Sequence, residues 1–323
     1  MLIYIKPLST FPKLHSDTLF GAITSAISEL YPEILEEMIK EFNDGRPPFI
    51  LSSPFPYIYN DETKVRFYPK IILDYDSSTI NRDILKKYKK INFIDEEIFL
   101  SLINGDLTEL DLLSKYGEYY ESGSLLMTKN YGILLMTKNY GINGHIGSNI
   151  LPNNSVNRLT NESDAIFYSQ GDTFQNMGLF FIINFFDEEY EDIIKNVFKF
   201  LKDRGFGRDL STGKGQFDYE ISDDLVKEFE NSDGNSFTTL SRYIPTPDDL
   251  NKINEYSAYE IDSKRGRHPS GEIRKEVKFF KEGSSFPNYQ LTYGNIIKSS
   301  DVNPAVEYGY AFPVRFNRSD MNE

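Results

Sequence analysis

The sequence predicts an α+β fold, with helices on one face of an antiparallel sheet. Residues 178–186 form an apolar run typical of a buried strand, and apolar residues at helical spacing follow until Gly205. The same order of strand and helix opens the chain, at residues 2–5 and then from Ser16 onwards. Further strand candidates, separated by turns, occupy the last third of the chain.

The first half is expected to begin with a strand over 2–5, closed by Pro7. Residues 16–18 are typical of a helix N-cap, and the helical pattern after them ends at Pro32. A second, acidic helix is expected from about Glu33 to Phe42. Further along, strands are expected over 51–59 and 65–73, and helices within 95–116.

In the second half, acidic residues 187–192 favour a helix start, because negative charge interacts well with the positive end of the helix dipole. A strand is expected from Gln216. The remaining strand candidates are 238–243, 256–261, 276–280 and 308–316.

A nine-residue segment, Leu125–Ile133, recurs without change as residues 134–142. An odd period would move every side chain of a strand to the opposite face. We therefore expect both copies in an exposed loop, and two short copies are too few for a solenoid.

Composition sets the class of protein. The chain has 323 residues, 39% of them apolar, so it can bury one large core or two ordinary ones. It has no cysteine, which excludes disulfides and thiolate metal sites. The apolar start ends at Pro7, too soon for a signal peptide, and no apolar run approaches the roughly 20 residues of a membrane span. We expect a soluble cytoplasmic protein without a membrane partner.

The net charge of −14 argues against a simple nucleic-acid binder, but its distribution is uneven. Residues 264–281 carry seven Lys and Arg against two Glu, and residues 86–90 carry four lysines. Since screening limits charge effects to about 8–10 Å, a local basic groove can bind phosphates on an acidic body. Solvated surface charge is the alternative for both runs.

The segment 205–217 carries the most specific signal. Its four glycines let backbone amides line a hollow, and two hydroxyls, an Arg and a Lys add donors suited to phosphates. A nucleotide P-loop is excluded, because five residues separate Gly207 from Gly213 and the loop leaves a helix instead of entering one. A purely structural turn stays open. The predicted RNA contacts here are Gly205, Gly207, Arg208, Ser211, Thr212, Gly213, Lys214 and Gly215.

Several motifs occur in a fixed order along nearly the full length. They are 15–23 (HSDTLFGAI), 53–56 (SPFP), 68–70 (YPK), 157–160 (NRLT), the glycine loop, 240–245 (LSRYIP), 264–267 (KRGR), 282–286 (EGSSF) and 308–312 (YGYAF). Together they resemble the RAMP superfamily of CRISPR proteins, most closely subunit four of the type III-A (Csm) effector complex.

This resemblance implies two ferredoxin-like (RRM-like) domains, expected over 1–165 and 166–323, with the glycine loop in the second. It implies a subunit that grips the 5′ handle of the guide RNA and joins the large Cas10-type subunit to the RAMP backbone subunit. Members of this family are not known as the nuclease of the complex, so we expect no enzyme activity, cofactor or metal.

Four further residues are candidate RNA contacts: His15, Arg158, Arg265 and Arg267. For His15 three roles are open, namely acid–base catalysis, contact with RNA and a structural role. The alternative function is therefore a metal-independent endoribonuclease that processes CRISPR precursor RNA. No second positioned partner for catalysis is evident, because His145 and His268 lie in other segments.

Overall fold

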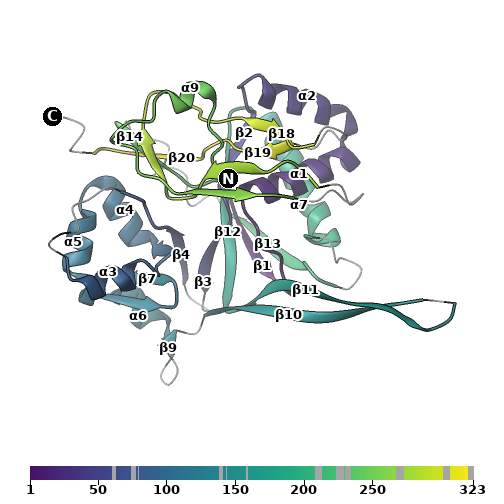
Figure 1. Cartoon of the computed structure of the whole chain (residues 1–323), viewed down its shortest axis with the longest axis horizontal. Helices are drawn as coiled ribbons and strands as arrows, with labels where there is room; N and C mark the ends of the chain where they lie inside the picture. Colours follow the sequence, from purple (N-terminus) through teal and green to yellow (C-terminus); the bar gives the residue numbers. More distant parts are fainter. Residues whose placement is uncertain are drawn as a thin grey trace.

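We describe a computed structural model of the chain, with the elements arranged as in Figure 1. The described residues are 1–59, 63–73, 78, 80–137, 141–142, 144–157, 159–207, 213–222, 229, 234–266, 273–300 and 306–318. The predicted α+β class is confirmed, since a large mixed sheet is combined with several helices. None of the described helices is long and apolar enough to cross a membrane.

Next to the edge strand of the main sheet is β1 (Leu2–Pro7), which lies between two strands from much later in the chain. It pairs antiparallel with β12 (Met177–Phe185) and with β13 (Phe217–Ser222), so that Leu2 faces Ile182 on one side and Ser222 on the other. On the far side of β12 follows β3 (Phe55–Tyr59). All four strands were predicted, but their pairing was not.

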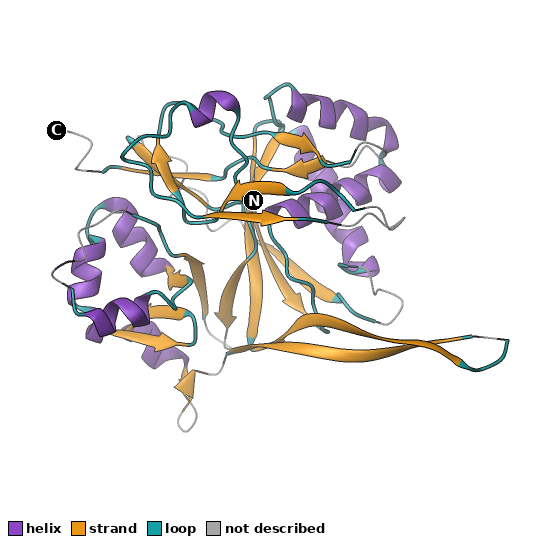
Figure 2. Ribbon diagram, viewed as in Figure 1, coloured by secondary structure: helices purple, strands orange, loops and turns teal. Residues whose placement is uncertain are grey.

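Three helices, α1 (Ser16–Leu30), α2 (Pro32–Asn43) and α7 (Glu189–Arg204), lie on one side of this sheet (Figure 2). Each helix buries an apolar stripe at helical spacing, such as Ile194, Val197 and Leu201 of α7. The predicted positions of all three helices are confirmed. The structure places the N-cap at His15, one residue earlier than expected.

A separate group of helices and strands lies at the left of Figure 1, around the other end of the sheet. Its strands are β4 (Lys64–Pro69), β5 (Phe93–Asp95), β7 (Leu125–Thr128) and β6 (Tyr119–Ser122), in that order. Its helices are α3 (Arg82–Tyr88), α4 (Glu96–Asn104), α5 (Glu109–Ser114) and α6 (Lys129–Leu135), with a 3₁₀ turn at Tyr116–Glu118.

The duplicated segment corrects the expectation of an exposed loop. The first copy forms β7 and most of α6, and its Leu125, Leu126 and Met127 are buried between β5 and β6. The described part of the second copy instead contributes the end of α6 and two short strands, Met136–Thr137 and Gly141–Ile142. One sequence therefore has two structures, because the first copy pairs with β5 and β6 whereas the two short strands of the second pair with each other.

The C-terminal third consists of short strands in three small sheets. They are β17-β14-β20 (Ser285–Pro287, Ser236–Thr239, Pro313–Phe316), β15-β16 (Ile261–Lys264, Val277–Phe280) and β18-β19 (Ile296–Lys298, Val306–Tyr308), joined by loops and the short α9 (Pro247–Leu250). Three predictions are wrong in detail: 256–260 is turn and loop, the strand expected over 238–243 ends at residue 239, and 308–316 divides between two strands. β2 (Phe49–Leu51) pairs with β12 at the top of the main sheet.

A long hairpin, β10 (His145–Val156) and β11 (Ser163–Gln175), projects from the molecule at the lower right of Figure 1. It carries exposed apolar side chains, among them Ile150 and Tyr168. The expected division at residue 165 falls inside β11, and strands from both sides of it share the main sheet.

Candidate nucleic-acid interface

The glycine-rich loop leaves the end of α7 and returns to the sheet at β13. Its base is held by the chain's own backbone, since the Phe206 amide donates to the Gly215 carbonyl and the Gly215 amide donates to the Thr10 carbonyl, both at 2.9 Å. The Gly205 amide donates to the carbonyl of Leu201 and ends α7. These three amides therefore bond within the protein and do not point at a ligand.

Aromatic packing fills the space beneath the loop. The rings of Phe206 and Phe217 stack 4.7 Å apart, and Phe11 meets both rings edge-on. A Cβ atom on Gly215 would lie 1.7 Å from the carbonyl oxygen of Phe206, and the residue has a φ of +72°. At its base the loop therefore matches the alternative kept in the sequence analysis, a purely structural turn.

The outer part of the loop is exposed. Gly207 and Gly213 both have positive φ and lie at the surface, and Lys214 is half-buried. Contact between this part and a phosphate stays a prediction. Three further predicted contacts of the loop lie outside the described residues: Arg208, Ser211 and Thr212.

His15 is held in a defined position at the N-terminus of α1. Its Nδ1 lies 3.0 Å from the carboxylate of Glu282, which also accepts a hydrogen bond of 2.6 Å from the hydroxyl of Ser53. Because an ionised carboxylate only accepts hydrogen bonds, Nδ1 must carry the proton, and Nε2 is left for other contacts. The side chain of His15 is 36% exposed, so an external group can reach it.

Glu282 is buried, and its charge depends on these partners. Burial alone would raise the pKa of Glu282, but the hydrogen bonds and charge of His15, with the bond from Ser53, hold it below its ordinary value. The carboxylate therefore stays ionised and orients His15. Sequence reasoning assigned no such partner, because 267 residues separate the two side chains.

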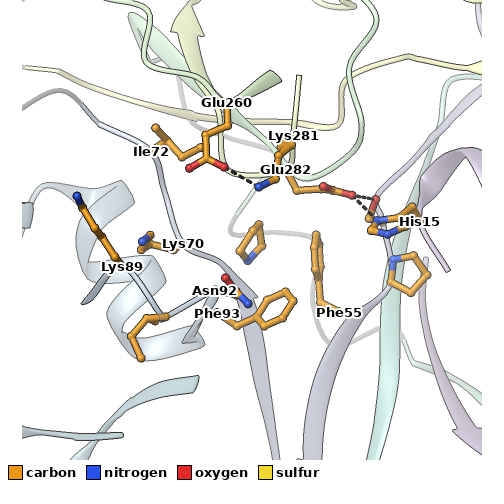
Figure 3. Close-up of a pocket in the computed structure, with 14 residues that line it drawn as sticks. His15, Phe55, Lys70, Ile72, Lys89, Asn92, Phe93, Glu260, Lys281 and Glu282 are labelled. Atoms are coloured by element: carbon orange, nitrogen blue, oxygen red, sulfur yellow. Dashed lines mark hydrogen bonds and ion pairs between the residues drawn. The ribbon is translucent and has the colours of Figure 1, made fainter. Parts of the chain in front are cut away.

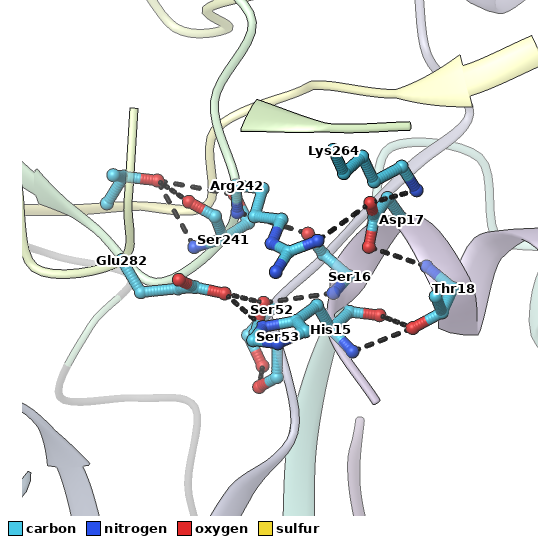
Figure 4. Close-up of polar contacts among 11 residues, drawn as sticks. His15, Ser16, Asp17, Thr18, Ser52, Ser53, Ser241, Arg242, Lys264 and Glu282 are labelled. Atoms are coloured by element: carbon cyan, nitrogen blue, oxygen red, sulfur yellow. Dashed lines mark hydrogen bonds and ion pairs between the residues drawn. The ribbon is translucent and has the colours of Figure 1, made fainter. Parts of the chain in front are cut away.

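A network of buried ion pairs lies next to His15 (Figure 4). Asp17 pairs with Lys264 and, at 3.1 Å, with Arg242, whose amide also donates to the hydroxyl of Ser16. Lys264 also forms an ion pair of 2.6 Å with Glu307, which extends the network. Although burial would raise the pKa of Asp17, the two cations lower it.

Three cations of the basic stretch 264–281 are engaged in ion pairs within the chain. Lys264 and Arg274 pair with the buried Glu307, and Lys281 pairs with Glu260. Arg265 differs, because it is exposed and its guanidinium donates a long hydrogen bond, 3.4 Å, to the Arg274 carbonyl. The remaining two predicted contacts lie outside the described residues: Arg158 and Arg267.

The described candidates border residues 8–18, an extended segment that leads into the start of α1. The glycine loop bonds to Thr10, His15 ends the extended part, and Asp17 holds the strand that leads to Arg265. The structure thus links three predicted contacts that are distant in sequence. In the described part of the chain, no set of three His, Asp or Glu side chains could hold a metal ion.

Comparison with solved structures gives a consistent fold. A chain of the Csm3–Csm4 subcomplex of the type III-A CRISPR-Cas interference complex matches 98% of this chain and 99% of its own length, with a TM-score of 0.70 and 20% identity. A chain of the Csm1–Csm4 cassette bound to AMPPNP matches 98% of this chain and 97% of its own, with a TM-score of 0.53 and 20% identity.

A more remote match comes from the type III-B Cmr-beta complex bound to cognate target RNA, which covers 89% of this chain and 86% of its own length. Its TM-score is 0.50 and its identity 12%. No protein-family model and no curated protein sequence matches the chain. The neighbours from the type III-A complexes are Csm4 chains, so the predicted resemblance to that subunit is confirmed at the level of the fold.

Proposed function

We propose that the chain is a non-catalytic, RNA-binding subunit of a type III-A CRISPR interference complex. In this role it holds the 5′ handle of the guide RNA and joins the large Cas10-type subunit to the RAMP backbone subunit. The observation that carries the proposal is the end-to-end match with Csm4 chains, which were solved together with Csm3 in one case and with Csm1 in another.

The strand order supports a ferredoxin-like unit within this fold. β1, α1, β3, β12, α7 and β13 follow one another as βαββαβ, and their strands lie in the order β13-β1-β12-β3. We assign these elements to the first ferredoxin-like unit, which then includes the glycine loop. Residues 60–175 are insertions in this unit, and the strands after 234 belong to a second, less regular one.

The segment 8–18 and its neighbours supply the chemistry for a single RNA strand. The exposed part of the glycine loop and the guanidinium of Arg265 can each donate to a phosphate, and the Nε2 of His15 can accept from a 2′-hydroxyl group. The buried ion pairs around Asp17 fix the N-terminus of α1 relative to Lys264, the residue that precedes Arg265. Binding to a fixed set of donors costs less ordering entropy than binding to flexible ones.

The test measures binding of an RNA with a guide handle at several salt concentrations. Arg208→Ala combined with Lys214→Ala should weaken binding and reduce the slope of log K against log salt by about 0.7 for each lost phosphate contact. Lys86→Ala combined with Lys195→Ala removes the same charge from exposed positions elsewhere and serves as the control. Equal affinity and slope for both double variants would show that the glycine loop does not bind RNA.

The alternative, a metal-independent endoribonuclease, rests on the pairing of His15 with Glu282. In such a reaction Nε2 would take the proton of a 2′-hydroxyl, whose oxygen displaces the 5′ oxygen of the next nucleotide and leaves a 2′,3′-cyclic phosphate. The proton would then return to the 5′ oxygen. Incubation with repeat RNA in EDTA separates the two functions, since cleavage that is lost in His15→Ala would establish the nuclease.

A further inference from the structure

A pocket of about 420 Å³ lies beside His15, between the main sheet and the C-terminal third of the chain (Figure 3). Its wall comes from five segments that are far apart in sequence: His15, 53–55, 69–72, 89–93 and 260 with 281–282. Its volume falls within the range of small-molecule sites. Neither the glycine loop nor Arg265 lines it.

One wall of the pocket is apolar and aromatic. The rings of Phe55 and Phe93 lie 6.3 Å apart at 63°, and both contribute to the lining. Phe55 is 2% exposed, so its ring is fixed by the core behind it, whereas Phe93 is half-buried. Ile72 and Ile91 extend the apolar surface. Such a wall suits a flat, weakly polar ring.

Three lysines from separate segments line the same pocket: Lys70, Lys89 and Lys281. The ammonium of Lys70 lies 4.4 Å from the ring of Tyr88, and its burial lowers the pKa of Lys70, an effect that a bound anion would offset. Lys89 is exposed and forms no ion pair within the described part of the chain. Because Lys281 already pairs with Glu260, Lys70 and Lys89 are the two lysines that can face a ligand, and on a chain of net charge −14 their convergence indicates an anionic one.

Between the lysines and the aromatic wall lies Asn92. Its backbone is fixed on both sides, because its amide donates to the Ser124 carbonyl and its carbonyl accepts from the amide of Lys70, both at 2.9 Å. Its side chain is exposed and makes no hydrogen bond to the residues that the structure describes. A carboxamide offers one acceptor and two donor hydrogens, which suits the edge of a nucleobase.

We propose that this pocket takes one unpaired nucleotide of a single RNA strand, with its base against Phe55 and Phe93. The phosphate lies at Lys70 and Lys89, and Asn92 contacts the edge of the base. This inference rests on the proposed RNA-binding function and adds a base-specific subsite to it. A nucleotide uses all three features of the pocket, whereas an acidic peptide would leave the flat wall unused.

The experiment uses the full chain and fluorescein-labelled eight-nucleotide RNAs of single composition, namely A₈, C₈ and U₈, in anisotropy titrations. Lys89→Ala combined with Asn92→Ala should weaken the binding of the preferred RNA on the order of tenfold, as expected when one stacked base is no longer held. The double substitution should also reduce the difference in affinity between the three RNAs. Both side chains are exposed, so the fold should tolerate the change. Lys86→Ala is the matched control, because it removes a lysine from the same basic cluster, 86–90, at a position that does not line the pocket.

Three outcomes would overturn the inference. If the wild type binds RNA and the pocket variant behaves like Lys86→Ala, the proposed function stands and the subsite is wrong. If the wild type binds none of the RNAs and no handle RNA, the proposed function fails as well. If the pocket variant keeps its RNA affinity but no longer co-assembles with a purified Cas10-type subunit, the pocket takes a protein side chain instead.

Discussion

The glycine loop and the N-terminus of α1 were both predicted to contact RNA, yet they are built in different ways. The base of the loop is closed by backbone hydrogen bonds and three aromatic rings, all close-packed. The N-terminus of α1 is fixed by charged side chains that come from residues 242, 264 and 282. A glycine-rich segment can therefore indicate close packing. A cluster of charged side chains whose partners are distant in sequence, by contrast, cannot be recognised from one stretch of the chain.

The largest loss of stability should come from adding a side chain at Gly215, next to the backbone of Phe206. Gly215→Ala places a Cβ atom 1.7 Å from a backbone oxygen, so the loop must move, and we expect a loss of more than about 4 kcal/mol in the free energy of unfolding. Gly213→Ala is the control, because its φ of +77° is also positive but no atom lies within 4 Å. It should lose only about 1–2 kcal/mol. Equal losses in urea unfolding would mean that packing does not close the loop.

The next effect concerns the ion pairs. Asp17→Asn leaves Arg242 and Lys264 beside a neutral side chain in a buried site, and we expect it to destabilise the protein by about 3 kcal/mol. Lys195→Ala breaks an exposed pair with Glu191 and should change stability by less than about 0.5 kcal/mol. Chemical denaturation of both variants measures the difference. Similar small changes would show that the network contributes no more than surface charge.

A third prediction uses pH to separate the two regions. The pKa of Glu282 is lowered in the folded protein, so its stabilising contribution is complete above the unfolded value, near 4.5, and is lost as the pH falls through the folded value. Glu282→Gln should cost about 2 kcal/mol at pH 7, because it replaces charged hydrogen bonds to His15 and Ser53, and less below pH 4. Unfolding curves from pH 3 to 7 test this, and a pH-independent difference between the two proteins would contradict it.

The smallest loss of stability is expected for a substitution that involves no charged group. Phe206→Leu keeps an apolar side chain of similar size beneath the loop and should cost about 1 kcal/mol. Because no titratable group contributes to this stacking, the cost should be the same at pH 4 and pH 7. A strong dependence on pH would mean that the loop and the charged region act as one unit.

Local sequence patterns were sufficient for most helices and strands. The strand, helix and strand around the glycine loop were predicted with their order and near their observed ends, because apolar spacing and caps act within a few residues. Pairing between strands far apart, such as β1 with β12 and β13, and the contact of His15 with Glu282 depend on the whole fold and could not be read in this way.

The duplicated segment shows the limit most directly. Its first copy was expected in a loop but forms a buried strand, since the position between β5 and β6 decides its structure and its sequence alone does not. The basic stretch 264–281 shows a related limit. Its charges could be counted, but their carboxylate partners, such as Asp17, lie far away in the sequence.

The position of β1 has a consequence for synthesis on the ribosome. β1 is made long before both of its partners, which are made only after residue 176, and in the finished sheet it lies between them. Until residue 222 has left the exit tunnel, β1 has one or both edges unpaired, which is a hazard for aggregation. Nascent chains that stop before β13 should therefore depend on chaperones more than the finished protein does.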